Sequence, residues 1–233
     1  MVTRGQRACY QPLIQIRVVS VSPAVTIQDL QVILTQPAGS RLVVVKIITS
    51  EPGLYGIGCA TFTQRFQAVH AAIEKHLKPF VIGRDVDRIE EIWQMAMVNS
   101  YWRNGPVLNN AISGVDLALW DLLGKLRGEP VHAMIGGPVR DELSFYATGA
   151  RPDLARQMGF IGGKLPLHHG PAEGDEGLAR NVALLADMRD KCGDDFWLMY
   201  DCWMALDVDY ATRLAQACHE HGLKWIEEAI SPD

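Results

Sequence analysis

The second half of this chain alternates short apolar segments with amphipathic helical patterns, and this alternation limits the possible folds more than any other feature of the sequence. After Gly136-Gly137, residues 175–191 place apolar side chains on one helical stripe, and Asp207 begins a second helix that ends at Gly222. Apolar strand candidates lie beside these helices, at residues 158–166, 196–203 and 224–229. Alternating strands and helices build a parallel sheet with right-handed crossovers. We therefore predict three β/α units, which begin a TIM-type barrel but do not complete one.

The first half has a different pattern, in which strands come first and helices follow. The strand patterns are separated by turn residues, as in an antiparallel meander, and span residues 25–34, 41–49 and 54–60. Helical patterns follow at residues 64–78, 87–98 and 109–127. We therefore predict an α+β domain over residues 25–137, preceded by an N-terminal extension over residues 1–24 and followed by the incomplete barrel over residues 138–233.

Composition and charge exclude several classes of protein. The chain of 233 residues is 48% hydrophobic, which allows a sizeable core, but no apolar run approaches the length of about 20 residues that crosses a bilayer. The formal net charge is −5 without a basic stripe, so we expect neither nucleic acid nor a membrane as a partner. Five scattered cysteines without a CxxC pair indicate reduced thiols in a cytoplasmic protein and argue against a zinc site.

Two acids stand at the ends of predicted strands. Asp201 closes the apolar run "FWLMYD", and Glu227 follows it by about the length of one β/α unit, in a barrel whose eight units take about 250 residues. Neighbouring strands lie about 4.8 Å apart, so the two carboxylates can reach a common point. Two bare carboxylates that close repel each other, and a Mg²⁺ ion, which prefers hard oxygen ligands, removes the conflict. We therefore predict a metal site, while the alternative that Asp201 caps a loop and Glu227 is a solvated acid stays open.

The segment "AISGVDLALWDLLGK", residues 111–125, resembles a signature of the mandelate racemase and muconate lactonizing enzyme branch of the enolase superfamily. The match rests on small residues, on two spaced acids and on the final Gly-Lys. The resemblance implies that the α+β domain is a capping domain followed by a partial (β/α) TIM-type barrel, in an enolase-like fold. It also implies that Asp116 and Asp121 are structural rather than catalytic.

A finer resemblance, to the L-rhamnonate dehydratases, extends from about residue 106 to residue 230. It is carried by "FYATGARPDLARQMGFIGGKLP", "FWLMYDCWMALDVDYATRLA" and "LKWIEEA". Toward the N-terminus, "LYGIGCATFTQ" and "IGRDVDRIEEIWQ" are more similar to the mannonate dehydratases. The resemblance implies a lyase that takes a proton from C2 and the hydroxyl from C3 of a small-molecule sugar acid, giving a 2-keto-3-deoxy acid. It also implies a homo-oligomer for the full-length protein.

The resemblance assigns roles to individual residues. Asp201 matches the first ligand of a catalytic Mg²⁺ ion and Glu227 matches the second, while Glu228 would be turned elsewhere. A third acidic ligand and a His–Asp acid/base pair would lie on later strands, beyond Asp233, so the resemblance implies an incomplete chain. Lys164 lies near the end of the strand "FIGGKLP", where many relatives carry a Lys-x-Lys pair, although Pro166 stands in place of the second lysine here. Lys164 is expected to support the substrate carboxylate electrostatically, while the alternative of a solvated or ion-paired lysine stays open.

Other polar residues near these positions have structural alternatives. His168 and His169 lie in the loop after the same strand and could contact substrate, although adjacent histidines in such a loop are more often surface residues. Arg151 could bind a carboxylate bidentately, but an ion pair within the protein is the stronger interpretation. Trp203 stands where many relatives have an Asn or a His, and the L-rhamnonate dehydratases share this departure.

Three interpretations of function stay open. The first is an L-rhamnonate dehydratase, and the second is a dehydratase of mannonate, fuconate or another sugar acid. The third is a truncated chain without activity. In the family, loops of the capping domain select the substrate, and the capping domain is the part of this sequence that matches least.

Overall fold

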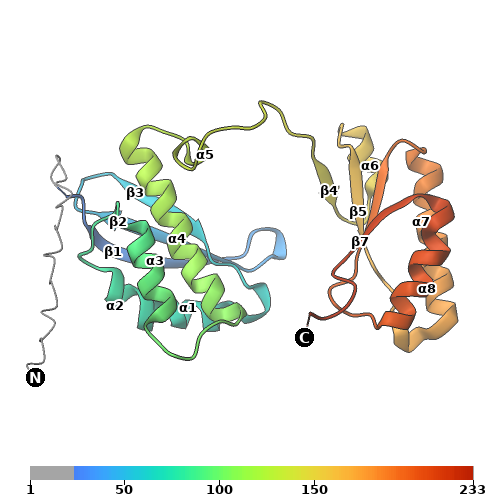
Figure 1. The fold of residues 1–233 in the computed structure, drawn as a ribbon, viewed down its shortest axis with the longest axis horizontal. Coiled ribbons are helices and arrows are strands. Elements are labelled where there is room, and N and C mark those ends of the chain that lie inside the picture. Colours follow the sequence, from blue (N-terminus) through green and yellow to red (C-terminus); the bar gives the residue numbers. More distant parts are fainter. Residues whose placement is uncertain (1–23, 233) are drawn as a thin grey trace, which may run out of the picture. The chain divides into compact units, whose positions relative to one another are not determined.

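The computed structural model describes residues 24–232, which form two compact units that divide after Pro138 (Figure 1). Each unit has its own hydrophobic core. The N-terminal extension predicted for residues 1–24 lies outside the described residues, apart from Ala24. Within the described part of the chain, no helix is both long and apolar enough to span a membrane.

The first unit contains the predicted antiparallel meander, with strand order β1-β2-β3. Its strands are Ile27–Thr35, Leu42–Thr49 and Tyr55–Cys59. Along β2 every second side chain is buried, including Val43, Val45 and Ile47, so one face of the sheet lies on the core.

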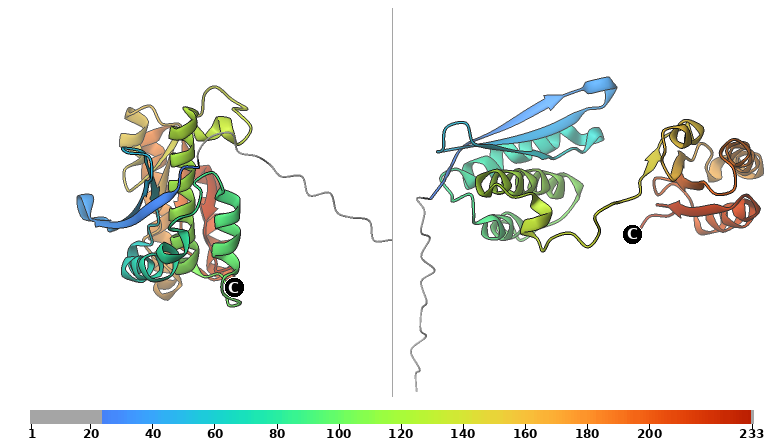
Figure 2. Two further views of the ribbon diagram at one scale, coloured as in Figure 1. Left: turned by 90° about the vertical axis from the view of Figure 1, so that its left-hand side faces the viewer. Right: turned by 90° about the horizontal axis from the view of Figure 1, so that it is seen from above.

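The helices of the first unit pack either on that face of the sheet or on the long helix that lies against it (Figure 2). They are α1, α2, α3, α4 and α5, at Phe66–Ala72, Lys78–Val81, Ile89–Val98, Pro106–Arg127 and Val131–Met134. A π-helical turn, Ile73–Leu77, connects α1 to α2 and makes one nearly continuous segment where the sequence predicts one helix. Proline at its first position starts α4, and Gly128 in the left-handed conformation ends it.

The small residues of the α4 signature allow this helix to lie directly against β3. A Cβ atom on Gly58 would lie 2.0 Å from the carbonyl oxygen of Gly114, and one on Gly56 would lie 2.0 Å from that of Ala118. A Cβ on Gly114 would in turn meet the Ala60 side chain at 2.4 Å. The helix and the strand therefore approach so closely that no side chain fits between their backbones at these positions.

Asp121 fastens the same contact with hydrogen bonds. Its Oδ2 atom accepts from the backbone N–H of Ile57 at 2.8 Å and from Lys125 Nζ at 2.6 Å. These partners lie on β3 and on α4, so Asp121 joins the strand to the helix. This contact agrees with the structural role that the resemblance implies for Asp121.

The second unit is a partial TIM-type barrel, with a parallel sheet in the order β4-β5-β6-β7. The strands are Tyr146–Thr148, Gly162–Pro166, Trp197–Asp201 and Leu223–Glu227. The helices between them are α6, α7 and α8, at Pro152–Gln157, Gly174–Cys192 and Val208–Cys218. In Figure 1, α7 and α8 stand on one side of the sheet, and their apolar residues share a core with Leu165, Leu198 and Tyr200.

The structure differs from the prediction at the start of this unit. The described residues contain a fourth strand, β4, and a helix, α6, which the sequence pattern did not reveal because they are only three and six residues long. The predicted strand over residues 158–166 is shorter than expected and begins at Gly162. The reason is that α6 ends at Gln157 and Gly159, with φ +89°, turns the chain before the strand.

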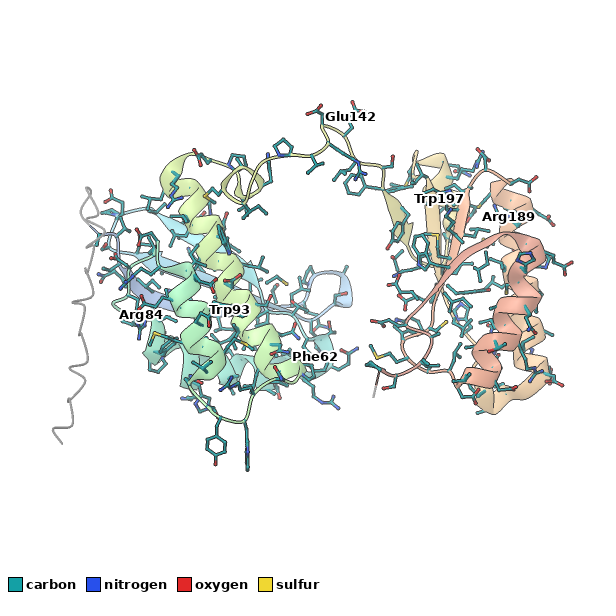
Figure 3. All side chains as sticks on the ribbon, viewed as in Figure 1. Phe62, Arg84, Trp93, Glu142, Arg189 and Trp197 are labelled. Atoms are coloured by element: carbon teal, nitrogen blue, oxygen red, sulfur yellow. The ribbon has the colours of Figure 1, made fainter. Side chains whose placement is uncertain are left out.

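Arg189 on α7 ties the amino ends of β6 and β7 to the helical layer. Its guanidinium donates to the carbonyl oxygens of Phe196 and Gly193, at 2.6 Å each, and to those of His221 and Gly222, at 2.9 and 3.1 Å. Figure 3 shows Arg189 on the helical side of the sheet. The amino ends of the strands are therefore held by a structural cation, and the carboxyl ends carry the candidate site.

Candidate metal centre

Asp201 and Glu227 are the last residues of neighbouring parallel strands. They are direct register partners in the β6–β7 pairing, so both lie at the carboxyl edge of the sheet and their side chains leave it on the same face. The structure thus brings together the two acids that the sequence singles out. Glu228 follows immediately after β7.

Lys164 on β5 lies between the two carboxylates. Its Nζ atom is 3.0 Å from Asp201 Oδ2 and also forms an ion pair with Glu227 Oε1. Lys164 is 6% exposed and Asp201 is 9% exposed, so these two groups are shielded from solvent, whereas the Glu227 side chain is 34% exposed. The ammonium group offsets the repulsion between the two acids.

The surroundings of Lys164 keep it positively charged. Burial by itself lowers the pKa of Lys164, but the hydrogen bonds to Glu227 and Asp201 outweigh it, so the pKa lies above its ordinary value. A lysine with a raised pKa is a poor proton acceptor at neutral pH and a good source of fixed positive charge. The two ion pairs of Lys164 are consistent with a role in electrostatic support.

The second oxygen of each carboxylate faces a weaker donor. Trp225 Nε1 donates to Glu227 Oε2 at 3.3 Å, and the backbone N–H of Trp203 donates to Asp201 Oδ1 at 3.4 Å. Both distances are long for hydrogen bonds, so these oxygens are only loosely engaged.

The donor set fits a hard divalent cation. Mg²⁺ is commonly bound through one or two carboxylates, with water and substrate oxygens completing six positions. The described residues contain no group of three or more His, Cys, Asp or Glu side chains that could hold a metal ion. Asp201 and Glu227 would accordingly supply two of the six positions.

The backbone is strained directly after both acids. Trp203, Met204 and Glu228 have φ values of +48°, +59° and +47°, a region that bulky residues rarely adopt. Hydrogen bonds between the two segments hold this conformation, from the N–H of Cys202 to the carbonyl of Glu227 at 3.0 Å and from that of Met204 to Glu228 at 2.5 Å. Strain of this kind costs about 1–3 kcal/mol per residue and clusters at functional sites.

Arg151 has the structural role that the sequence favoured. Its guanidinium makes two hydrogen bonds to the carboxylate of Asp153, at 2.8 and 2.6 Å. The hydrogen bond from Arg151 lowers the pKa of Asp153 to about 2. Arg151 is therefore engaged by a neighbour on its own segment.

The structure separates the two adjacent histidines. His169 is tied into the protein, because its side chain pairs with Glu173 and its backbone bonds to the side chain of Asn181. His168 is exposed. Asn181 itself is fully buried, and the sequence did not predict its role. The available signal was its position on the apolar stripe of its helix, between Leu178 and Leu185.

Comparison with known families covers both units. Residues 15–136 match the family model of the mandelate racemase / muconate lactonizing enzyme N-terminal domain. Residues 151–233 match the model described as enolase C-terminal domain-like. The two matches divide the chain in the same order as the two compact units.

Solved structures show the same similarity. An enolase from Pantoea ananatis, with bound D-gluconate and Mg, is 35% identical over 89% of this chain and 60% of its own, with a TM-score of 0.76. The L-rhamnonate dehydratase from Gibberella zeae is 34% identical over 92% of this chain and 61% of its own, with a TM-score of 0.81. A Zymomonas mobilis ZM4 protein, 24% identical over 90% of this chain and 62% of its own, supports the fold alone with a TM-score of 0.82. The chain spans about three fifths of the length of each of these proteins.

Proposed function

This chain belongs to the mandelate racemase and muconate lactonizing enzyme family of the enolase superfamily. On that basis we propose that the protein is a Mg²⁺-dependent acid-sugar dehydratase, with L-rhamnonate as the first candidate substrate. The observation that carries the proposal is the pair of register-matched carboxylates, Asp201 and Glu227, with the buried Lys164 between them. The similarity to the Gibberella zeae L-rhamnonate dehydratase supports the choice of substrate.

The residues of this site would have two roles, metal binding and orientation of the substrate. Asp201 and Glu227 would hold the ion, and bound Mg²⁺ supplies positive charge next to the substrate carboxylate. Lys164 adds a fixed positive charge from a buried position and orients that carboxylate. The long contact from Trp225 Nε1, at 3.3 Å, leaves Glu227 Oε2 available to an ion.

The overall reaction removes water from the sugar acid. A base takes the proton from C2, the electron pair of the C–H bond forms the C2–C3 double bond, and the C3 hydroxyl leaves with a proton as water. The resulting enol rearranges to the 2-keto-3-deoxy acid. The resemblance implies a general base for this proton, and we assign no residue of this chain to that step.

A second substrate class is favoured by one observation. The Pantoea ananatis enolase, which holds D-gluconate, is as similar to this chain as the Gibberella zeae enzyme is. Dehydration of gluconate, mannonate or another sugar acid is therefore the alternative proposal. It uses the same ion, the same two carboxylates and the same chemistry at C2 and C3.

The direct test is an assay of the purified full-length protein against a panel of acid sugars. We expect L-rhamnonate to give a 2-keto-3-deoxy acid in the presence of Mg²⁺, and we expect EDTA to abolish the product and added Mg²⁺ to restore it. Turnover of D-mannonate or D-gluconate alone would select the alternative substrate class. Turnover that continues in EDTA would refute the metal dependence.

A further inference from the structure

We propose that His168 is a substrate-binding residue of this site and that the buried Asn181 and Tyr210 position it. The proposal rests on the proposed function and adds a contact to the substrate from the loop after β5. His168 would hydrogen-bond a hydroxyl group of the sugar acid.

Side chains alternate between two faces along β5 and just beyond it. Leu165 and Leu167 are both buried in the core beneath the helices. Lys164 lies on the opposite face, where it contacts Asp201 and Glu227. The segment stays paired with β6 one residue past the strand, because the N–H of Leu167 donates to the carbonyl of Asp201 at 2.9 Å. A residue that follows Leu167 in this extended arrangement faces the same side as Lys164, and that residue is His168.

The neighbouring residue is held on the helical side by a buried polar network. The N–H of His169 donates to Asn181 Oδ1 at 3.3 Å, and the His169 carbonyl accepts from Asn181 Nδ2 at 2.8 Å. The same carbonyl accepts from the Tyr210 hydroxyl at 3.1 Å, and Asn181 Nδ2 also donates to that hydroxyl at 3.2 Å. Helices α7 and α8 thus fix the backbone of His169. The backbone of His168, the preceding residue, is fixed with it, and this sets the direction of the His168 side chain.

The network also connects to the strand that carries Asp201. The Tyr200 hydroxyl donates to the backbone carbonyl of Asn181 at 2.5 Å, and Tyr200 is the residue before Asp201. Asn181 is 0% exposed, and no buried side-chain nitrogen or oxygen among the described residues lacks a hydrogen-bond partner. A buried, fully bonded network of this kind is rigid. It therefore holds the loop and the strand end in a fixed relation to each other.

His168 suits a substrate hydroxyl better than the metal ion. Among the described residues, no group of three His, Cys, Asp or Glu side chains could hold a metal ion, so His168 does not act as a third ligand beside Asp201 and Glu227. A neutral imidazole can both donate and accept a hydrogen bond, which matches the hydroxyl groups of a sugar acid. Its exposure leaves the ring accessible to a ligand.

The test compares single variants with L-rhamnonate as the probe, in the full-length protein. We expect His168→Ala to raise KM about tenfold with little change in kcat, which is the sign of a contact made equally in the ground state and the transition state. His168→Asn, which keeps hydrogen-bonding capacity, should recover part of the loss. The matched control is His219→Ala, an exposed histidine before the amino end of β7, which should leave KM unchanged.

A double variant tests the positioning role. Tyr210→Phe removes the hydroxyl that bonds His169, so it should raise KM, and His168→Ala with Tyr210→Phe should be no worse than His168→Ala alone. If the increases in KM of the two single variants multiply in the double variant, Tyr210 does not act through His168.

Two outcomes separate this inference from the proposed function. If the wild-type protein is active and His168→Ala has an unchanged KM, only this inference is overturned. If the wild-type protein turns over no acid sugar, the proposed function is overturned and this role with it. Calorimetric Mg²⁺ binding should be the same in His168→Ala and wild type, and its loss would make His168 a ligand and refute the proposal.

Discussion

Replacing Asp201 with Asn, or Glu227 with Gln, is expected to reduce kcat/KM for the acid sugar by about a thousandfold or more. Each change keeps the size of the side chain and removes the negative charge that would hold Mg²⁺. The contribution of a bound ion to the transition state is several kcal/mol, and each 1.36 kcal/mol corresponds to about a factor of ten in rate. The measurement is steady-state kinetics with L-rhamnonate and saturating Mg²⁺.

The matched control for these variants is Glu228→Gln. Glu228 is the next residue after Glu227 and carries the same charge, but it lies past the end of β7 and outside the ion pairs with Lys164. We expect Glu228→Gln to stay within about threefold of the wild type, because a charge outside the site contributes little to the reaction. If Glu227→Gln and Glu228→Gln lose equal activity, the negative charge of the segment sets the rate, and not a specific metal ligand.

Replacing Gly58 with Val is expected to unfold the first unit. The new Cβ would lie 2.0 Å from the backbone carbonyl oxygen of Gly114 and 2.7 Å from the backbone nitrogen of Ala118, and backbone atoms cannot move aside as a flexible side chain can. Overpacking in a core costs about 1–3 kcal/mol and more when backbone must shift, which is a large part of a typical stability of about 5–15 kcal/mol. Hydrogen–deuterium exchange by mass spectrometry is the suitable measurement, because it reports on each unit separately.

The expected exchange pattern is specific. Peptides from β3 and α4 should lose protection in Gly58→Val, while peptides from α7 should keep it. Ile57→Thr provides the control, since Ile57 is adjacent on the strand, is 46% exposed and points away from α4. Wild-type protection of β3 and α4 in the Gly58 variant would show that the close packing of strand and helix is not required.

The positions of the candidate ligands could be predicted because strand polarity determines them. Asp201 and Glu227 each follow an apolar run, and in a parallel sheet all carboxyl ends share one edge, so the acids had to meet there. The position of Lys164 between them depends on the exact register of β5 against β6, which pairs Pro166 with Asp201. Sequence spacing alone does not determine that register.

Short elements and buried polar groups were harder to predict. Strand β4 is three residues long, so it contains too few positions to show an alternating pattern. The Asn181 network depends on residues far apart in the chain, and an Asn on an apolar stripe does not reveal its partners. Trp203 and Met204 adopt left-handed conformations, in which Met204 bonds to Glu228 after β7 and Trp203 bonds to the Asp201 side chain. Neither residue type signals such a conformation.

The measurement that tests the central claim most directly is a titration of the protein with Mn²⁺, a paramagnetic substitute for Mg²⁺, followed by electron paramagnetic resonance. We expect one bound ion per chain that Mg²⁺ displaces, and we expect that site to disappear in the Asp201→Asn, Glu227→Gln double variant while it persists in Glu228→Gln. Binding that survives the double variant would place the metal elsewhere and contradict the assignment of these two carboxylates as its ligands.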